Sequence, residues 1–381
     1  MRKIRLFTPG PTPLIPEGQL AQARPLIHHR TPEFKAVMLE IRNNLRKIFR
    51  TESEIVLLSS SGTGAMEAAV ANLHAPGEKV IAVVAGKFGE RWAELAKAYG
   101  LQCIELTKEY GEAASAEEIL QVLRREGDAR SVLLQACETS TATAHDLEAV
   151  GKAVRREFPD VLIVVDAITA VACQPLLPDD WGLDVVIGGS QKAFGMPPGL
   201  AFLSLSPRAL GKLETVPAGR RYYFDLRKEL KNQLVGSTAY TPAISLIVGL
   251  NEVTKRMLDE GLDEIIRTAG LMAQATREGL RALGFRLLSS SPANAVTAAF
   301  PPEGIAADDL RKDLDQVFGV KVAGGQGKLK GQIIRIAHLG YFDVLDVVTV
   351  LAAVELALVR RGALRESGRG VQAALQVLTA G

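Results

Sequence analysis

The chain has only three cysteines among its 381 residues, and they lie far apart in the sequence. Cys103, Cys137 and Cys173 have neither the CxxC nor the CxxH spacing of a zinc site, so we expect reduced thiols, a cytoplasmic location and no metal centre. The sequence also lacks an excess of one charge, since its formal net charge is +2, which argues against nucleic acid as the main partner. Its apolar runs are interrupted and of strand length, so we expect no membrane span.

Apolar residues make up 47% and charged residues 23% of the chain, which is ordinary for a soluble globular protein. The length predicts one large domain and a smaller one. We expect an N-terminal arm over residues 1–20, a large domain over 21–255 and a small C-terminal domain over 256–381. The arm is rich in proline and glycine, so we predict extended chain there rather than a helix or a strand.

Short apolar runs alternate with segments of helical periodicity through the first half of the chain. The runs Lys79–Ala85, Leu101–Leu106 and Ser131–Ala136 are typical of buried strands, and a helical segment follows each of them. This order predicts an α/β fold with a mostly parallel, doubly wound sheet. The C-terminal part has helices and strands of its own, which predict a smaller α+β unit.

The stretch from residue 161 to 199 joins two strand-like runs that end at reactive side chains. The run VLIVV ends at Asp166, and DVVIGGS ends at Gln191 and Lys192. Neighbouring parallel strands would bring these ends to the edge where open α/β sheets bind ligands. A lysine there can form a Schiff base, and an acid there can pair with a pyridinium nitrogen. Taken singly, such an acid more often caps a strand end, and such a lysine more often lies in a solvated turn.

A second motif, IVLLSSSGTGAMEAAVANL, joins a short apolar run to a helix through a turn of serine, glycine and threonine. The turn would present backbone N–H groups and hydroxyls at a helix N-terminus, which favours a phosphate group. It is neither a P-loop nor a complete GxGxxG fingerprint. A simple N-capped strand–helix turn is the alternative interpretation.

Together, GGSQKAFGMPPG and the upstream VVDAITAV resemble the class V aminotransferases, which use pyridoxal 5′-phosphate on the fold-type I scaffold. The resemblance is greatest to the serine–pyruvate and alanine–glyoxylate aminotransferase branch, and it implies a large domain with a mostly parallel, doubly wound sheet and a smaller C-terminal α+β domain. It also implies a homodimer with active sites at the subunit interface. The implied reaction is ping-pong transfer of an amino group from serine, alanine or aspartate to a 2-keto acid such as glyoxylate or pyruvate.

The resemblance also implies a role for individual residues. Lys192 would bond the cofactor and move the Cα proton, Asp166 would pair with the pyridine nitrogen, and Arg335 would clamp the substrate carboxylate. Gly10 would line the substrate entrance. The remaining implied cofactor residues are Ser61, Gly62, Thr63 and Gln191 at the phosphate, Phe88 and Ile168 on the two ring faces, Ser140 or Thr141 at the O3′ edge, and Thr238 with Thr241 reaching the neighbouring subunit.

The sequence departs from the family after the hydroxyl loop. Ala142 stands where a glycine is common, and Ala144-His145-Asp146 replaces a small or proline-containing segment. His28 and His29 lie near the expected entrance, where a surface role before a helix is the simpler interpretation. The role of the C-terminal tail is open.

Two alternative functions remain. A lyase or desulfurase could use the same scaffold, but a desulfurase needs a mobile cysteine in its C-terminal half, and no cysteine follows Cys173. A non-catalytic subunit of a larger complex would have no need of Lys192, Asp166 and Arg335 together.

Overall fold

A seven-stranded sheet forms the centre of the computed structural model, which describes residues 3–217 and 221–380. All neighbouring strands are parallel except β10, which runs antiparallel to both of its neighbours, so the prediction of a mostly parallel sheet is confirmed. The strand order is β2 (Glu54–Leu58), β10 (Ala201–Leu205), β9 (Val185–Gly189), β8 (Leu162–Asp166), β5 (Ser131–Gln135), β3 (Lys79–Val84) and β4 (Gln102–Thr107).

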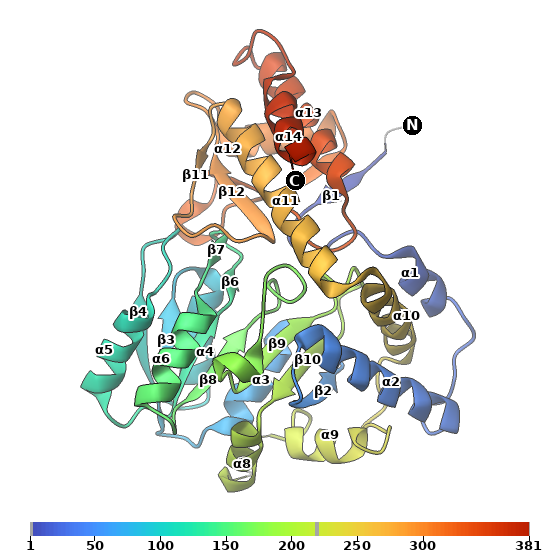
Figure 1. Ribbon diagram of the computed structural model, residues 1–381, viewed down its shortest axis with the longest axis vertical. Helices are drawn as coiled ribbons and strands as arrows, with labels where there is room; N and C mark the ends of the chain where they lie inside the picture. Colours follow the sequence, from blue (N-terminus) through green and yellow to red (C-terminus); the bar gives the residue numbers. More distant parts are fainter. Residues whose placement is uncertain (1–2, 218–220, 381) are drawn as a thin grey trace.

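Helices cover both faces of this central sheet, as the doubly wound prediction requires (Figure 1). Successive strand residues point to opposite faces, so Ile55 and Leu57 of β2 join one core while Val56 and Leu58 join the other. One face packs against α3 (Gly62–Leu73), α4 (Lys87–Ala98) and α8 (Pro207–Thr215). The other packs against α2 (Pro32–Phe49), α5 (Ala116–Glu126), α6 (Leu147–Glu157) and α10 (Ile244–Glu260).

Local sequence explains where several of these helices begin. Ser115 and Glu118 form a reciprocal capping box at the start of α5, and the Asp146 side chain accepts the Ala149 N–H at the start of α6. Thr31 caps α2 in the same way, just before a proline in its first turn. Two short helices, α7 (Pro178–Trp181) and α9 (Leu226–Gln233), complete this part of the chain.

A second sheet of five strands, the small sheet, lies above the central one in Figure 1. Its order is β1 (Arg5–Phe7), β13 (Val320–Gly324), β14 (Ile334–Ala337), β12 (Val296–Phe300) and β11 (Arg286–Leu287). It packs with α11 (Leu262–Ala282), α12 (Ala307–Gln316), α13 (Val344–Arg360) and α14 (Arg369–Ala380).

The prediction of an arm without helix or strand is wrong. Residues 5–7 pair in parallel with β13, some three hundred positions later in the chain, and α1 (Pro16–Gln22) follows with a proline in its first turn. A three-residue strand depends on a distant partner, so no local pattern reveals it. The proposed domain boundaries stay a prediction, although residue 255 falls inside α10.

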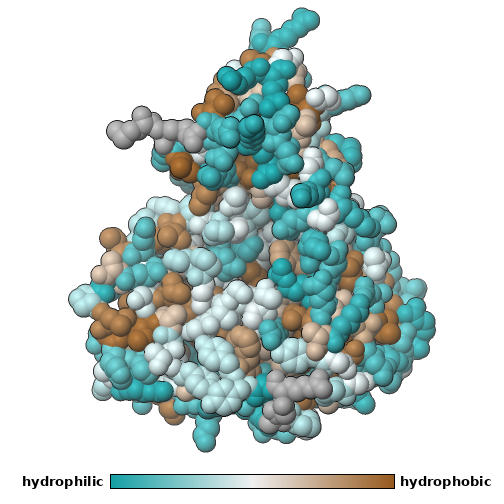
Figure 2. Space-filling model, turned by 180° about the vertical axis from the view of Figure 1, so that it is seen from behind, coloured by the Kyte–Doolittle hydropathy of each residue, from teal (hydrophilic) through white to brown (hydrophobic). Residues whose placement is uncertain are grey.

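No helix among the described residues is both long enough and apolar enough to cross a membrane. On the face shown in Figure 2, apolar side chains form small separate groups among hydrophilic ones.

Candidate active site

Lys192 and Asp166 follow two adjacent strands of the central sheet. Strand β8 ends at Asp166, which lies opposite Ile187 in the parallel register with β9, and β9 continues through Ser190 and Gln191 to Lys192. The prediction that these two runs are neighbouring strands is therefore confirmed. Both side chains are buried, with 6% of Asp166 and 9% of Lys192 exposed.

Burial shifts the pKa values of both groups toward neutral pH. Loss of hydration raises the pKa of the Asp166 carboxyl to about 6, against the opposing effects of the Ile168 N–H, 3.0 Å away, and the Lys192 charge. Loss of hydration lowers the pKa of the Lys192 amine to about 8, while the Asp166 carboxylate pulls it upward. The lysine is thus a better nucleophile near pH 8 than an exposed lysine, and the acid keeps a buried negative charge for a cationic partner.

The turn before α3 leaves several polar groups free for an anion. Ser61 occupies the N-cap position without bonding its side chain to the helix. The first N–H groups of a helix, here from Gly62 and Thr63, have no partner within it and attract negative charge. The Oε1 atom of Gln191 is buried and has no hydrogen-bond partner among the described residues. A half-turn of the amide exchanges its two ends, so Gln191 can offer this space a donor or an acceptor.

Ile168 closes one side of this turn. A Cβ atom on Gly62 would lie 2.2 Å from Ile168 Cδ1, so only glycine permits this approach. The Ile168 side chain also lies near Gly189, at the end of β9. It therefore lies between the phosphate turn and the strand that leads to Lys192.

Phe88 and Arg91 lie one turn apart on α4. The Arg91 guanidinium lies 4.8 Å from the centroid of the Phe88 ring, and its Nη1 atom donates to Thr63 Oγ1 over 3.1 Å. Arg91 therefore connects Phe88, which is predicted to cover a cofactor ring face, with Thr63 of the predicted phosphate turn. The sequence did not lead us to predict this role. The spacing of Phe and Arg in FGERW was the available signal, because residues three apart share a helix face.

Ser140 and Thr141 lie in the hairpin between β6 (Cys137–Glu138) and β7 (Thr143–Ala144). The Ser140 hydroxyl donates to the Glu138 carboxylate and accepts the Lys87 N–H over 3.0 Å. The Thr141 hydroxyl donates to Thr143 Oγ1 over 3.0 Å. Both hydroxyls thus have partners within the chain, and their contact with a cofactor stays a prediction.

Glu138 is a buried acid that the sequence analysis did not select. Its carboxylate also accepts the N–H groups of Phe88 and Gly89, over 3.0 and 2.9 Å, and so anchors the start of α4. Loss of hydration raises the pKa of Glu138, while the hydrogen bonds from Ser140 and Gly89 act in the opposite direction. The sequence signal that could have identified Glu138 is an acidic residue shortly after a fully buried strand.

Arg335 lies on β14 with only 6% of its surface exposed. Its Nε atom donates to the Gly324 carbonyl over 2.9 Å, and Nη1 donates to the Thr139 carbonyl over 2.8 Å. Loss of hydration lowers the pKa of Arg335 to about 10, and the negative charge of Glu138 opposes that shift. The guanidinium therefore remains charged at neutral pH beside the hydroxyl hairpin.

The N-terminal segment reaches Lys192 directly. The Pro9 carbonyl accepts a hydrogen bond from Lys192 Nζ, and a Cβ atom on Gly10 would lie 2.6 Å from the same nitrogen. The structure therefore places Gly10 against the predicted reactive lysine.

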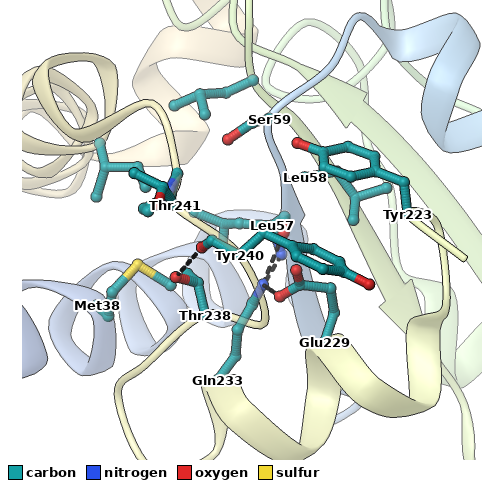
Figure 3. Close-up of a pocket in the computed structure, with 13 residues that line it drawn as sticks. Met38, Leu57, Leu58, Ser59, Tyr223, Glu229, Gln233, Thr238, Tyr240 and Thr241 are labelled. Carbon is teal, nitrogen blue, oxygen red and sulfur yellow. Dashed lines mark hydrogen bonds between the residues drawn. The ribbon is translucent and has the colours of Figure 1, made fainter. Parts of the chain in front are cut away.

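Thr238 and Thr241 line a pocket between α2, β2, α9 and α10 (Figure 3). The Thr238 hydroxyl donates to the Tyr240 carbonyl over 2.7 Å, and the loop is tied to the end of β2 by a 3.0 Å bond from the Ala243 N–H to Ser59 Oγ. The loop thus lies near the start of the phosphate turn of its own chain. Whether it reaches a neighbouring subunit stays a prediction.

His28 and His29 pack on each other with ring centroids 4.6 Å apart, ahead of α2. Arg30, the next residue, donates to the Thr238 carbonyl over 2.9 Å. This segment therefore contacts the Thr238 loop, and no described contact joins either histidine to Lys192.

Similarity to known proteins extends over nearly the whole chain. A model of the family described as Aminotransferase class-V matches residues 18–335. The soluble hydrogenase small subunit of Synechococcus is 36% identical over 383 residues, covering 99% of both chains. Serine–glyoxylate aminotransferase of Methylorubrum extorquens is 31% identical, covering 98% of this chain and 95% of its own. The crystal structure of an aspartate aminotransferase from Thermus thermophilus superposes with a TM-score of 0.88 at 36% identity, covering 93% of this chain and 99% of that one.

Proposed function

This chain belongs to the class V aminotransferases, and from that premise we propose that it moves the amino group of serine, alanine or aspartate to a 2-keto acid such as glyoxylate or pyruvate. It is a pyridoxal-phosphate-dependent transaminase on the fold-type I scaffold. The substrate proposal is supported by the names of its relatives, among them the serine–glyoxylate aminotransferase of Methylorubrum extorquens and the aspartate aminotransferase of Thermus thermophilus. We propose a ping-pong cycle in which one keto acid leaves before the next binds.

The burial of Lys192 and Asp166 at adjacent strand ends carries this proposal. Pyridoxal phosphate supplies an electron sink for a carbanion at the substrate Cα. Lys192 would hold the cofactor through its amine. Once the substrate amino group displaces that amine, it would take a proton from Cα, and in the second half of the cycle it would deliver one to the keto-acid carbon. Asp166 would keep a proton on the ring nitrogen, because a buried carboxylate stabilises a cation beside it. A subunit without catalysis would have no need of this costly pair.

The other site residues would hold the cofactor and orient the substrate. The unpaired amide of Gln191 and the free N–H groups of Gly62 and Thr63 fit a phosphate group, with Ser61 beside them. We propose that Phe88 and Ile168 cover the two ring faces and that Ser140 or Thr141 borders the O3′ edge. Arg335 offers the planar, permanently charged fork that binds a substrate carboxylate, and Gly10 leaves room at the entrance.

We also propose a homodimer with active sites at the subunit interface, in the cytoplasm. Tyr222, Leu234 and Val235 flank the Thr238 loop in sequence and are 77%, 49% and 59% exposed, which supports a partner on that side. Thr238 and Thr241 would then reach the partner's phosphate site. The three thiols are free, which supports a reducing compartment.

A panel of amino donors and keto acids, followed by half-reaction spectra, tests the substrate assignment. We expect serine, alanine or aspartate to change the visible absorbance of the holoenzyme, and glyoxylate or pyruvate to restore it. Lys192→Ala should lose the absorbance band of the lysine-bound cofactor, whereas Lys97→Ala, at an exposed position on helix α4, should keep it. Protein that stays colourless and unresponsive after incubation with pyridoxal phosphate would refute the proposal.

A further inference from the structure

The central part of the predicted N-terminal arm, from Thr8 to Ile15, contacts Lys192 through Pro9 and Thr12, and the name arm is kept for these residues. The Pro9 carbonyl accepts from Lys192 Nζ, and Thr12 Oγ1 donates to the Lys192 carbonyl over 2.8 Å. The Ile15 N–H then donates to the Gly195 carbonyl over 2.8 Å. The arm thus holds both the side chain and the backbone of the residue on which the proposed chemistry depends.

The two ends of the arm belong to different parts of the fold. Strand β1, which precedes it, pairs with β13 of the small sheet, with Phe7 opposite Val322. Helix α1, which follows it, packs on α10 beside the central sheet, so closely that a Cβ atom on Gly18 would lie 2.5 Å from Val253. Any shift of the small sheet relative to the central sheet therefore moves the arm across Lys192.

Arg335 is connected to the first end of the arm. Its Nε atom donates to the carbonyl of Gly324, which ends β13, the strand that pairs with β1. The path from the carboxylate site to Lys192 therefore runs from Arg335 to β13, along β1 and through Pro9. Each step is a hydrogen bond, a strand pairing or a short stretch of continuous backbone.

We infer that the arm is a positioning element that holds the Lys192 amine through the Pro9 carbonyl and transmits carboxylate binding at Arg335 to that amine. The inference rests on the roles proposed for Lys192 and Arg335. When substrate releases the lysine amine, the Pro9 carbonyl offers an acceptor already within reach. One N–H is then directed to Pro9, and the lone pair of the neutral amine is free to take the Cα proton.

The charge balance at Lys192 makes it sensitive to the arm. Burial favours the neutral amine, while the Asp166 carboxylate favours the ammonium and the Arg335 charge disfavours it. A carbonyl acceptor bonds more strongly to an ammonium than to an amine. Displacement of Pro9 therefore changes how readily the amine holds a proton.

Gly10→Ala in the holoenzyme tests the positioning role. The new Cβ atom would lie 2.6 Å from Lys192 Nζ, at a backbone φ of +140°. Gly304→Ala is the matched control, because Gly304 also has a positive φ, +81°, but no atom lies within 4 Å of the added Cβ. We expect Gly10→Ala to move the midpoint of the pH titration of the visible absorbance and to lower kcat about tenfold, in addition to any rise in KM from a narrower entrance. The control should match the unmodified enzyme.

A folded Gly10→Ala enzyme that titrates like the control would overturn the positioning role. If that variant does not fold, Thr12→Val serves instead, because it removes the hydroxyl bond to the Lys192 carbonyl at nearly constant shape. An unchanged titration midpoint in Thr12→Val would also overturn the positioning role. Holoenzyme without any visible absorbance would refute the proposed function itself, whereas coloured, active variants that match their controls would refute only the role of the arm.

Two glycines inserted between Phe7 and Thr8 test the transmission. Propionate, a carboxylate without an amino group, should bind at Arg335 and shift the titration midpoint of the unmodified holoenzyme. In the insertion variant we expect that shift to fall by about half or more, because the slack chain no longer moves with β1. A full shift in that variant would show that the carboxylate acts on Lys192 directly and would overturn transmission through the arm.

Discussion

Arg335 donates a 2.8 Å hydrogen bond to the backbone carbonyl of Thr139, which joins the small sheet to the hairpin that follows β5 of the central sheet. A second bond from its Nε atom to Gly324 fixes the plane of the guanidinium. Among the described residues, none is hydrogen-bonded to its Nη2 atom. The fork is therefore held by backbone groups while one edge remains for a carboxylate.

Replacing Arg335 should weaken substrate binding and spare the cofactor. We expect Arg335→Lys to raise KM about tenfold and Arg335→Ala to lower kcat/KM about a hundredfold, because lysine keeps the charge but loses the planar fork. Steady-state kinetics and visible spectra check both effects. Arg281→Gln, at an exposed position in the last turn of helix α11, is the control and should leave KM unchanged. Loss of cofactor from Arg335→Ala would show that this arginine is misassigned.

Arg91 should contribute to cofactor affinity. Its guanidinium packs on Phe88 and bonds to Thr63, which places a positive charge beside the phosphate turn. We expect Arg91→Gln to raise the Kd for pyridoxal phosphate about tenfold, or about 1.4 kcal/mol, and Arg91→Lys to give a smaller loss. Fluorescence titration of cofactor-free protein measures both. Lys97→Gln lies on the same helix at an exposed position, and an equal Kd for it and Arg91→Gln would contradict this role.

The raised pKa of Asp166 predicts how the stability of the cofactor-free protein depends on pH. The folded pKa of about 6 lies above the ordinary value of 3.8, so the folded state favours the protonated acid. Stability is therefore lost as the pH rises from about 4 to about 6, and the ionised acid destabilises the fold by a constant amount above that range. Asparagine mimics the protonated acid. We expect Asp166→Asn to be more stable by roughly 1–3 kcal/mol at pH 7.5, with a smaller advantage at pH 5. Urea unfolding at the two pH values measures this difference, and an advantage that does not shrink toward pH 5 would argue against a raised pKa.

The placement of Asp166 and Lys192 after neighbouring strands followed from the sequence, because strand ends are local features. The run VLIVV and the acid after it mark β8 and Asp166 without knowledge of any partner, and β9 and Lys192 follow in the same way. The run Lys79–Ala85 predicted a buried strand, and β3 spans Lys79–Val84. These predictions depend only on residues near one another in the chain.

The missed features all depend on distant partners. The role of Glu138 depends on the N–H groups of Phe88 and Gly89, which belong to a different strand–helix unit. Strand β1 is only three residues long and exists through its pairing with β13. The contact of Pro9 with Lys192 spans nearly half the chain. Local periodicity carries no information on such pairs.

Ala142, where the family resemblance led us to expect a glycine, adopts a φ of +59° in the hydroxyl hairpin. A left-handed conformation costs an L-residue roughly 1–2 kcal/mol, which Ala142→Gly would relieve. Against this gain, the buried methyl is worth about 0.8 kcal/mol, and glycine loses roughly 0.5–1 kcal/mol of chain entropy. We therefore expect Ala142→Gly to be nearly neutral, whereas Ala275→Gly, at a buried position inside α11, should cost about 1.5–2 kcal/mol with no strain to relieve. Equal losses for the two variants in urea unfolding would show that Ala142 carries no strain, and that its replacement of glycine has no energetic consequence for the hairpin.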